Sequence, residues 1–274
     1  MRADLHMHSV HSDGTLPVRK LLDYAKSKRL HIISLTDHDS TEGVIEAIKY
    51  GESINLRVIP GIELSTISNG ESVHVLGYFK DMVPENILKF SKEQHAFRRE
   101  RILKMAKNVV EIHGLKINYE RLMKPIGTIT RAHLIRELHL SNPHLTTEYI
   151  FNNFLRENCP GYIHSTKMTT EDGIKFLHDE GALVVIAHPV LLKKNNILDI
   201  INNPLVGGIE GIYPKNKPED EIRFRKIAKE HNLVITAGSD YHGIVDYSHE
   251  DLAYNVLTGE DLELFLERLE SRWK

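Results

Sequence analysis

The amino-terminal stretch of the chain is rich in side chains that bind metal ions. Three histidines and two aspartates fall within "DLHMHSVHSDG", residues 4–14. His6 and His8 are separated by one residue, and side chains on a strand alternate between its two faces. A strand here therefore places both imidazoles on one face, where they can bind one metal ion, and Leu5 and Met7 on the other.

Further ligand-type residues stand where apolar segments end, in "SLTDHD", "GIELS", "VIAHP" and "AGSDYHG". Because the carboxyl ends of parallel strands open onto one face of an α/β fold, residues from these segments converge there. A strand with two incidental histidines is the alternative, and it does not account for the other segments. This convergence predicts a metal site, and the residues expected to meet there are His6, His8, Asp13, Asp37, His38, Glu63, His188, Asp240 and His242, with His74 of "VHVLG" pointing inward.

The elements that must position these residues follow an alternating pattern. Apolar runs rich in β-branched residues indicate strands, and amphipathic helices come between them. This alternation predicts parallel βα units in a barrel or a doubly wound sheet. The expected strands are Ala3–His8, "HIISLTDHDS", "RVIPGIELS", "SVHVLGYF", "ALVVIAHP", "GGIEGIYP" and "LVITAGSDYHG". The expected helices are one capped by Thr15, then Thr41–Tyr50 and Glu219–His231.

A central stretch lacks the strand pattern and is predicted to be helical. Helices are expected over Glu85–His113, Arg131–Leu140 and Thr147–Asn158. The run "FRRER" on the first of these, with Arg98, Arg99 and Arg101, is expected to be a solvated face. We therefore expect a barrel domain, residues 1–83 and 166–274, and a helical insertion, residues 84–165, that caps the substrate site.

Composition restricts the class of protein. The 274 residues are 41% hydrophobic and 27% charged, which is ordinary for a globular protein with a buried core. A net charge of −3 gives no basic field for long nucleic acid. No apolar run approaches the ~20 residues that cross a bilayer, so no membrane partner is expected. The single cysteine, Cys159, excludes an internal disulfide and has no neighbouring base to activate it. We expect a cytoplasmic monomer.

The combination of motifs resembles the PHP family, named for polymerase and histidinol phosphatase. The resembling residues are "DLHMHSVHSDG", "LTDHD", "GIELS", "HVLGY", "AHP" and "GSDYHG", in that order, at both ends of the chain. The resemblance implies a distorted (β/α)₇ barrel that binds three divalent ions and hydrolyses phosphate esters. Manganese is the expected metal, with zinc or iron as alternatives, since mixed imidazole and carboxylate ligands suit all three.

The resemblance also implies a role for each ligand. The first ion would take His6, His8, Glu63 and Asp240; the second Glu63, His74 and His188; the third Asp13, His38 and His242. Catalysis, by a metal-activated hydroxide, would then depend on Glu63, Asp240 and His242. Asp37 and Asp39, beside His38, are expected to orient an imidazole rather than to catalyse.

Part of the insertion resembles one PHP subgroup. "TITRAHLIREL" is similar to the "GRPHIA" segment of stand-alone proteins that remove a phosphate from nucleoside 3′,5′-bisphosphates or trim short RNAs from the 5′ end. Arg131 can hold a phosphate through two hydrogen bonds, and we expect Lys167 and His133 to bind substrate beside it. The alternative for Arg131 is that it caps or salt-bridges a surface helix.

Three functions are compatible with these motifs. A phosphoesterase acting on a small nucleotide or a short RNA 5′ end is favoured, because the "TRAHL" segment and the helical insertion go with that subgroup. A histidinol-phosphate phosphatase of the same family is the second. The third is a non-enzymatic module that binds metal for structure, and the full set of ligand residues argues against it.

Overall fold

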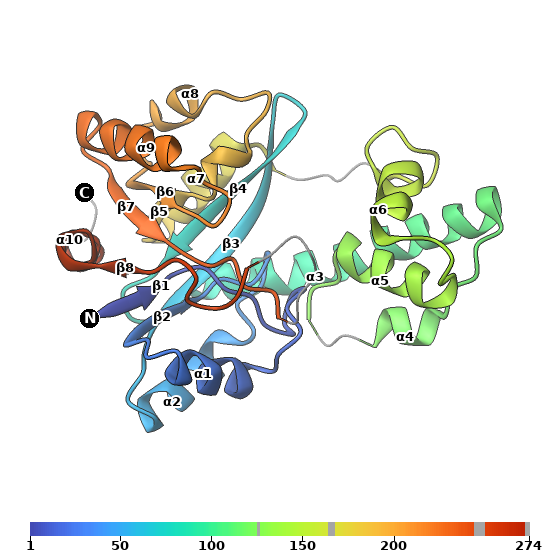
Figure 1. Cartoon of the computed structure of the whole chain (residues 1–274), viewed down its shortest axis with the longest axis horizontal. Helices are drawn as coiled ribbons and strands as arrows, with labels where there is room; N and C mark the ends of the chain where they lie inside the picture. Colours follow the sequence, from blue (N-terminus) through green and yellow to red (C-terminus); the bar gives the residue numbers. More distant parts are fainter. Residues whose placement is uncertain (125–126, 164–167, 244–249, 272–274) are drawn as a thin grey trace.

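The strands of the protein form one sheet around which most of the chain is organised. The structure, a computed structural model, describes residues 1–124, 127–163, 168–243 and 250–271. Its eight-stranded sheet has the order β7-β6-β5-β4-β3-β2-β1-β8. The strands are β1 Arg2–Asp4, β2 Ile32–Leu35, β3 Arg57–Ser68, β4 Glu71–Tyr78, β5 Leu183–Ile186, β6 Gly208–Ile212, β7 Val234–Ala237 and β8 Leu257–Thr258. Around it lie the helices α1 Val18–Ser27, α2 Val44–Ser53, α7 Thr170–Asp179, α8 Ile197–Ile201, α9 Pro218–Glu230 and α10 Gly259–Glu270 (Figure 1).

One strand does not run in the expected direction. Neighbours among β1, β2 and β3 are parallel, as are those among β5, β6 and β7, but β4 is antiparallel to both β3 and β5. The expectation of parallel units throughout is therefore wrong at "SVHVLGYF". The cause is a two-residue turn: Ser68 pairs with Glu71, and Asn69 and Gly70 between them have φ of 48° and 67°. Both residues of such a turn need positive φ, which Asn-Gly supplies at little cost.

The sheet nearly closes into the expected barrel. Beyond β1, the backbone of Leu5–His8 pairs with the chain that follows β7. Leu5 N–H donates to the Ala237 carbonyl at 3.0 Å, and His8 N–H to the Tyr241 carbonyl at 2.9 Å. The short β8 pairs antiparallel with β1 at the other end. Strand β1 is thus shorter than predicted, but its continuation keeps an extended, paired backbone.

This continuation has the alternation that the His-x-His spacing predicts. Leu5 and Met7 are completely buried and belong to two different hydrophobic clusters of the barrel. His6 and His8 are also buried and face other polar side chains. The first helix begins later than expected, at Val18, because Pro17 occupies the N-cap position. The helix expected from Thr41 likewise begins later, at Val44.

The segment between β4 and α7 forms helices with a hydrophobic cluster of their own (Figure 1). Helix α3 is buried against the barrel through Ile87 and against this separate cluster through Ile102, Met105 and Val109. The predicted helix Thr147–Asn158 stops at Leu155, and its second half is a π-helical turn. The helices are α3 Glu85–His113, α4 Tyr119–Met123, α5 Arg131–Ser141 and α6 Thr147–Ile150, with the π-helical turn Phe151–Leu155. The domain boundaries at residues 83 and 166 stay a prediction. In the described parts of the chain, no helix has both the length and the apolar character needed to span a bilayer.

Candidate metal centre and its pocket

The ligand-type residues found in the sequence meet at one end of the barrel. They come from the extended backbone after β1, the loop after β2, strands β3 and β4, and the segments after β5 and β7. Within the described residues, three groups each hold potential ligand atoms that all lie within 4.8 Å of one another. These groups are His6, His8, Glu63 and Asp240; His38, Glu63 and His74; and His8, Asp13, His38 and His242.

The first group contains the four residues expected around one ion. His6 Nε2 lies 3.3 Å from Glu63 Oε2, and His8 Nε2 lies 3.0 Å from Asp240 Oδ1. All four side chains are buried. The other carboxylate oxygen, Glu63 Oε1, lies 2.8 Å from His74 Nδ1 and 3.1 Å from His188 Nε2. Glu63 thus offers one oxygen to each of two sets of imidazoles, as a bridging ligand would.

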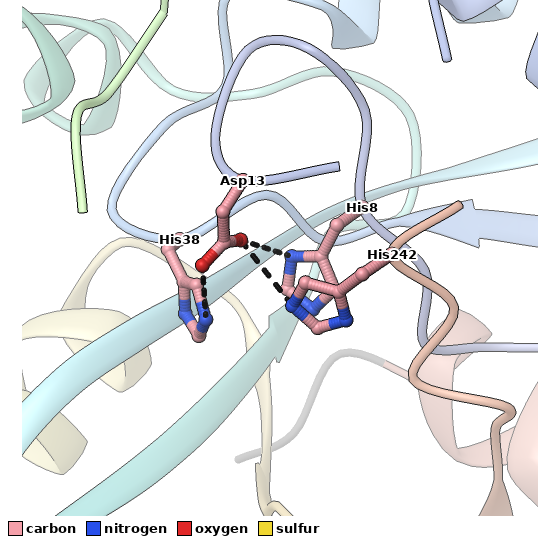
Figure 2. Close-up of side chains that lie close together, drawn as sticks. All are labelled: His8, Asp13, His38 and His242. Carbon is pink, nitrogen blue, oxygen red and sulfur yellow. Dashed lines mark ion pairs between the residues drawn. The ribbon is translucent and has the colours of Figure 1, made fainter. Parts of the chain in front are cut away.

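The third group surrounds Asp13 (Figure 2). Asp13 Oδ1 lies 3.3 Å from His242 Nε2 and 4.0 Å from His8 Nδ1, and Oδ2 lies 3.8 Å from His38 Nε2. Two details differ from the implied ligand sets. His8 stands between the first and third groups, and His38 also approaches Glu63, with Nδ1 2.8 Å from Oε2. The structure brings the nine residues together, while their assignment to particular ions stays a prediction.

Several atoms in this cluster suit a cation. His6 Nε2, His38 Nδ1, Glu63 Oε2 and Asp13 Oδ1 are buried and have no hydrogen-bond partner among the described residues. His38 Nδ1 and Glu63 Oε2 are close, but they are not aligned as donor and acceptor. Leaving buried polar atoms without a partner costs about 1–3 kcal/mol each, so a group of them needs an explanation. A divalent ion would accept all of these lone pairs, and the donor set therefore fits metal.

The carboxylates of the cluster are held in their ionised form. Burial raises the pKa of Glu63, but the charges of His38 and His6 outweigh it and hold that pKa well below its usual range. Burial likewise raises the pKa of Asp13, and His38 and His242 outweigh it and hold it well below its usual range. Ionised carboxylates are the form that binds a divalent ion.

The imidazoles divide into two kinds. Burial lowers the pKa of His8 to about 3 and that of His74 to about 4, so both are neutral at physiological pH. Burial also acts to lower the pKa of His242, but Asp13 and Asp240 outweigh it and raise it to about 9. Without a cation, protons on such imidazoles balance the carboxylate charges. Binding of divalent ions would release these protons.

Two aspartates near His38 behave differently from each other. Asp37 accepts hydrogen bonds from Ser9 N at 2.7 Å and Ser12 Oγ at 2.5 Å, and Ser12 Oγ lies 3.3 Å from His8 Nδ1. Asp37 therefore reaches an imidazole through a serine, close to the role expected for it. Asp39 accepts the Ser65 N–H at 2.6 Å and forms an ion pair with Arg98. The expected role of Asp39 as an imidazole partner is wrong, because an arginine occupies its free oxygen.

A cavity of about 340 Å³ opens from the cluster toward the helical segment. Asp13, His38 and His74 line the end that lies at the cluster. The rest of its wall includes three arginines, two aromatic rings and one carboxylate: Arg98, Arg101, Arg131, Phe151, Tyr162 and Glu157. This volume is in the range of sites for small molecules.

The expectation that "FRRER" forms a solvated face is wrong. The Arg98 side chain is only 16% exposed and donates to Ser65 Oγ at 2.8 Å. Arg101 donates through Nε to the Ile163 carbonyl at 2.8 Å. Arg99 contacts the Met123 carbonyl instead, at 2.5 Å. Helix α3 passes between two hydrophobic clusters, and Arg98 and Arg101 line a cavity there rather than open water, whereas Glu100 of the same run is exposed.

Arg131 lies at the first turn of α5, in the wall of the cavity. Its guanidinium carbon lies 5.7 Å from the ring centre of Phe151 and 5.6 Å from that of Tyr162. One nitrogen contacts the Leu155 carbonyl at 3.4 Å. Burial lowers the pKa of Arg131, but the group stays fully charged at neutral pH. Arg131 is therefore not an exposed surface arginine, but its contact with Leu155, the last residue of the π-helical turn, is compatible with the capping alternative, and its role in phosphate binding stays a prediction.

The other two predicted substrate residues have different outcomes. His133 is the third residue of α5, and its Nδ1 accepts the Thr130 N–H at 3.2 Å in a capping box. It does not line the cavity described above, so its contact with substrate stays a prediction. Lys167 lies outside the described residues.

Two buried groups beside the cluster were missed in the sequence. Glu210, in the middle of "GIEGIYP", accepts from His6 Nδ1 at 2.9 Å. Tyr213 donates its hydroxyl to Asp240 Oδ2 at 2.8 Å. A lone acidic residue inside an apolar strand was the available signal for Glu210. Tyr213 follows the strand end, and aromatic residues there are too common to single out.

Relatives of the chain have related activities on phosphate esters. A phosphoribosyl 1,2-cyclic phosphate 1,2-diphosphodiesterase of Eggerthella lenta is 27% identical over 250 residues, covering 89% of this chain and 95% of the relative. The 5′-3′ exoribonuclease Rnm of Escherichia coli K12 is 27% identical over 253 residues, covering 87% of this chain and 84% of the relative. A 3′,5′-nucleoside bisphosphate phosphatase of Chromobacterium violaceum is 28% identical over 247 residues, covering 87% of this chain and 86% of the relative.

Fold and family agree with these relatives. A Bifidobacterium adolescentis crystal structure, described as that of a metal-dependent phosphoesterase, superposes with a TM-score of 0.85. It is 27% identical and covers 97% of this chain and 96% of its own. The model of the PHP domain family matches residues 4–254. The chain therefore belongs to the PHP family and is a metal-dependent phosphoesterase.

Proposed function

We propose that the enzyme hydrolyses a phosphate ester of a small nucleotide that carries a second phosphate, a nucleoside 3′,5′-bisphosphate or the 5′ end of a short RNA. The observation that carries this proposal is the cavity. One end is lined by cluster residues, and three guanidinium groups lie in the rest of its wall. A substrate with two separated phosphates would place one phosphate at the metal cluster and the other at the guanidinium groups.

The two parts of the cavity have different tasks in this proposal. Three divalent ions, manganese first and zinc or iron as alternatives, would supply an activated water and neutralise charge on the scissile phosphate. Glu63, Asp240 and Asp13 hold the negative charge that keeps such ions in place, and His242 fixes the ion nearest the cavity. The arginines bind the second, non-reacting phosphate. Binding energy from that remote group positions the scissile one and can raise turnover as well as affinity.

The aromatic rings in the wall support a nucleotide rather than another phosphate ester. Phe151 and Tyr162 lie beside Arg131 and can stack on a base, which contributes about 1–3 kcal/mol in other proteins. A short RNA whose first nucleotide bears a 5′-phosphate and a 3′-phosphodiester presents the same pair of charges. Histidinol phosphate carries an ammonium group, and the wall would repel it because the three guanidinium groups outnumber the two carboxylates beside them, Asp39 and Glu157. The cavity therefore favours the nucleotide over the histidinol ester.

The test compares one variant on two substrates. Arg131→Met should lower kcat/KM for a nucleoside 3′,5′-bisphosphate. The corresponding loss of transition-state stabilisation should be about 1.5–3 kcal/mol, which is the strength of a charged hydrogen bond. The same change should leave a generic aryl phosphate almost untouched, because that substrate lacks the second phosphate. Arg121→Met is the matched control: this arginine also lies in the helical segment but pairs with Glu137, away from the cavity.

The outcomes distinguish the roles of Arg131. Equal losses on both substrates would place it at the reacting phosphate or in the fold. No loss on either substrate would contradict the proposal. If purified protein shows less than one divalent ion per chain after growth with added manganese, the proposed metal centre is wrong.

A further inference from the structure

Strand β6 carries a buried carboxylate that belongs to none of the three ligand groups. Glu210 is fully buried, and both of its oxygens are used. Oε1 lies 2.9 Å from His6 Nδ1, and Oε2 accepts the backbone N–H of His188 at 2.7 Å. One side chain therefore contacts two residues that the first and second ion would use.

The fold makes room for this carboxylate in two ways. The pairing of β6 with β7 shifts register between Glu210 and Ile212. Such irregularities re-aim a side chain relative to its neighbours. On the adjacent segment, a Cβ at Gly238 would lie 2.2 Å from His6 Cβ and 2.9 Å from Glu210 Oε1. Only glycine allows the imidazole and the carboxylate to meet there.

The contact with His6 determines which ring nitrogen is available. When Nδ1 carries the proton and donates to Glu210, Nε2 keeps its lone pair. Nε2 is buried without a hydrogen-bond partner among the described residues, 3.3 Å from Glu63 Oε2 and 3.4 Å from Asp240 Oδ1. A carboxylate behind an imidazole fixes the tautomer and the ring orientation of a metal ligand.

The contact with His188 acts on the backbone instead. His188 has φ of 26° and ψ of 60°, a conformation that side-chain-bearing residues rarely adopt. Holding such a residue costs on the order of 1–3 kcal/mol, and surrounding bonds must offset it. The bond from its N–H to Glu210 is one of them. The resulting bend presents His188 Nε2 to Glu63 Oε1 at 3.1 Å.

We propose that Glu210 is a positioning residue that assembles the first and second metal sites together, through the tautomer of His6 and the backbone of His188. This inference rests on the metal centre of the proposed function, but not on its substrate. The two residues that Glu210 contacts, His6 and His188, belong to the implied sets of the first and second ions and not to the group around Asp13. Loss of Glu210 should therefore weaken the binding of the first and second ions and leave the binding of the third unchanged.

The experiment measures metal affinity rather than turnover. Glu210→Gln keeps the size of the side chain but has only one acceptor for two donors. Increasing concentrations of a chelator are added to the Zn²⁺-loaded protein, and the zinc that remains bound is measured at each concentration. Glu137→Gln is the matched control, since Glu137 is also buried and takes several hydrogen bonds, from Asn118 N and Ser141 Oγ among others. Thermal melting in excess Zn²⁺ checks folding of both variants.

The expected result is a loss of about 10- to 100-fold in affinity at two of the three sites for Glu210→Gln only. Unchanged affinity at every site, or an equal loss at all three, would overturn the inference. If the wild-type chain holds its ions and Glu210→Gln holds them equally well, the inference about Glu210 fails but the proposed function stands. A wild-type chain that binds no Zn²⁺ or Mn²⁺ would instead refute the proposed function.

A second measurement needs no variant. In the Zn²⁺-loaded wild-type chain, nitrogen-15 NMR of the histidine side chains reports which ring nitrogen is protonated. We expect His6 to carry its proton on Nδ1, with Nε2 bound to metal. A proton on Nε2 would overturn the inference even if Glu210→Gln failed to fold.

Discussion

His133 makes the stability of the fold depend on pH. Its Nδ1 accepts the Thr130 N–H at the start of α5, and an acceptor nitrogen cannot carry a proton. Burial lowers the pKa of His133 to about 4, against about 6.5 in an unfolded chain. Protonation would break the capping box and place a charge in a half-buried position. The folded chain therefore resists a proton that the unfolded chain accepts.

The sign and size of the effect follow from these two values. Between about pH 6.5 and about pH 4 the unfolded chain binds more protons, so the free energy of unfolding rises with pH in that window. The contribution of His133 is fully present above about pH 6.5 and is lost as the pH falls toward 4. From about pH 7 to about pH 5, the loss is roughly 2 kcal/mol.

The assay compares urea denaturation at these two pH values for the wild-type chain and for His133→Gln. Glutamine is an ordinary partner in a capping box, and its carbonyl can accept the Thr130 N–H without titrating. Other titrating groups contribute equally to both proteins and cancel in the comparison. The wild-type chain should lose roughly 2 kcal/mol more than the variant. Equal losses would show that His133 is hydrated in the folded chain, and the reasoning from burial would be refuted.

The cluster leads to three further expectations. Glu63→Gln should lower kcat more than alanine at any single histidine, because both of its oxygens face imidazoles; steady-state kinetics with substantial remaining turnover would contradict a bridging role. His242→Ala should lose turnover yet keep the ions held through His6 and His188, which elemental analysis can verify; loss of all ions at once would indicate one cooperative unit. Adding Mn²⁺ to metal-free protein at about pH 7 should release protons, because carboxylates raise the pKa of His242 to about 9; a pH indicator that registers no release would mean that the imidazoles were already neutral.

Much of the candidate site could be predicted because strand ends converge. Alternation on a strand was enough to place His6 and His8 on the side opposite Leu5 and Met7. The polar residues after the other strands then had to meet them at one end of a barrel. The resemblance to the PHP family divides them into ion sites. That division stays a prediction, because His38 lies close to both Asp13 and Glu63 and His8 belongs to two of the groups.

The remaining features depend on information that periodicity does not contain. Hydrophobic alternation gives a strand but not its direction, so the reversal of β4 could be found only through the turn at Asn69 and Gly70. Glu210 stands among apolar neighbours, and its partners are distant in sequence. The positions of Arg98 and Arg101 cannot be predicted from the pattern of one helix face, because α3 is buried at two places on different clusters.

Helix α3, which packs on two hydrophobic clusters, limits how the substrate cavity can change in length during evolution. Helix α3 spans 29 residues, about 43 Å, and no residue between Ser91 and Ile102 is buried. Arg98 and Arg101 lie in that stretch. One extra residue there would rotate the far half by about 100° and advance it by about 1.5 Å. About seven extra residues would nearly restore the angle but add about 10 Å. No insertion preserves both, so the reach from the metal cluster to the arginines is fixed by a residue count, and substrates of another length would require changed side chains rather than a longer helix.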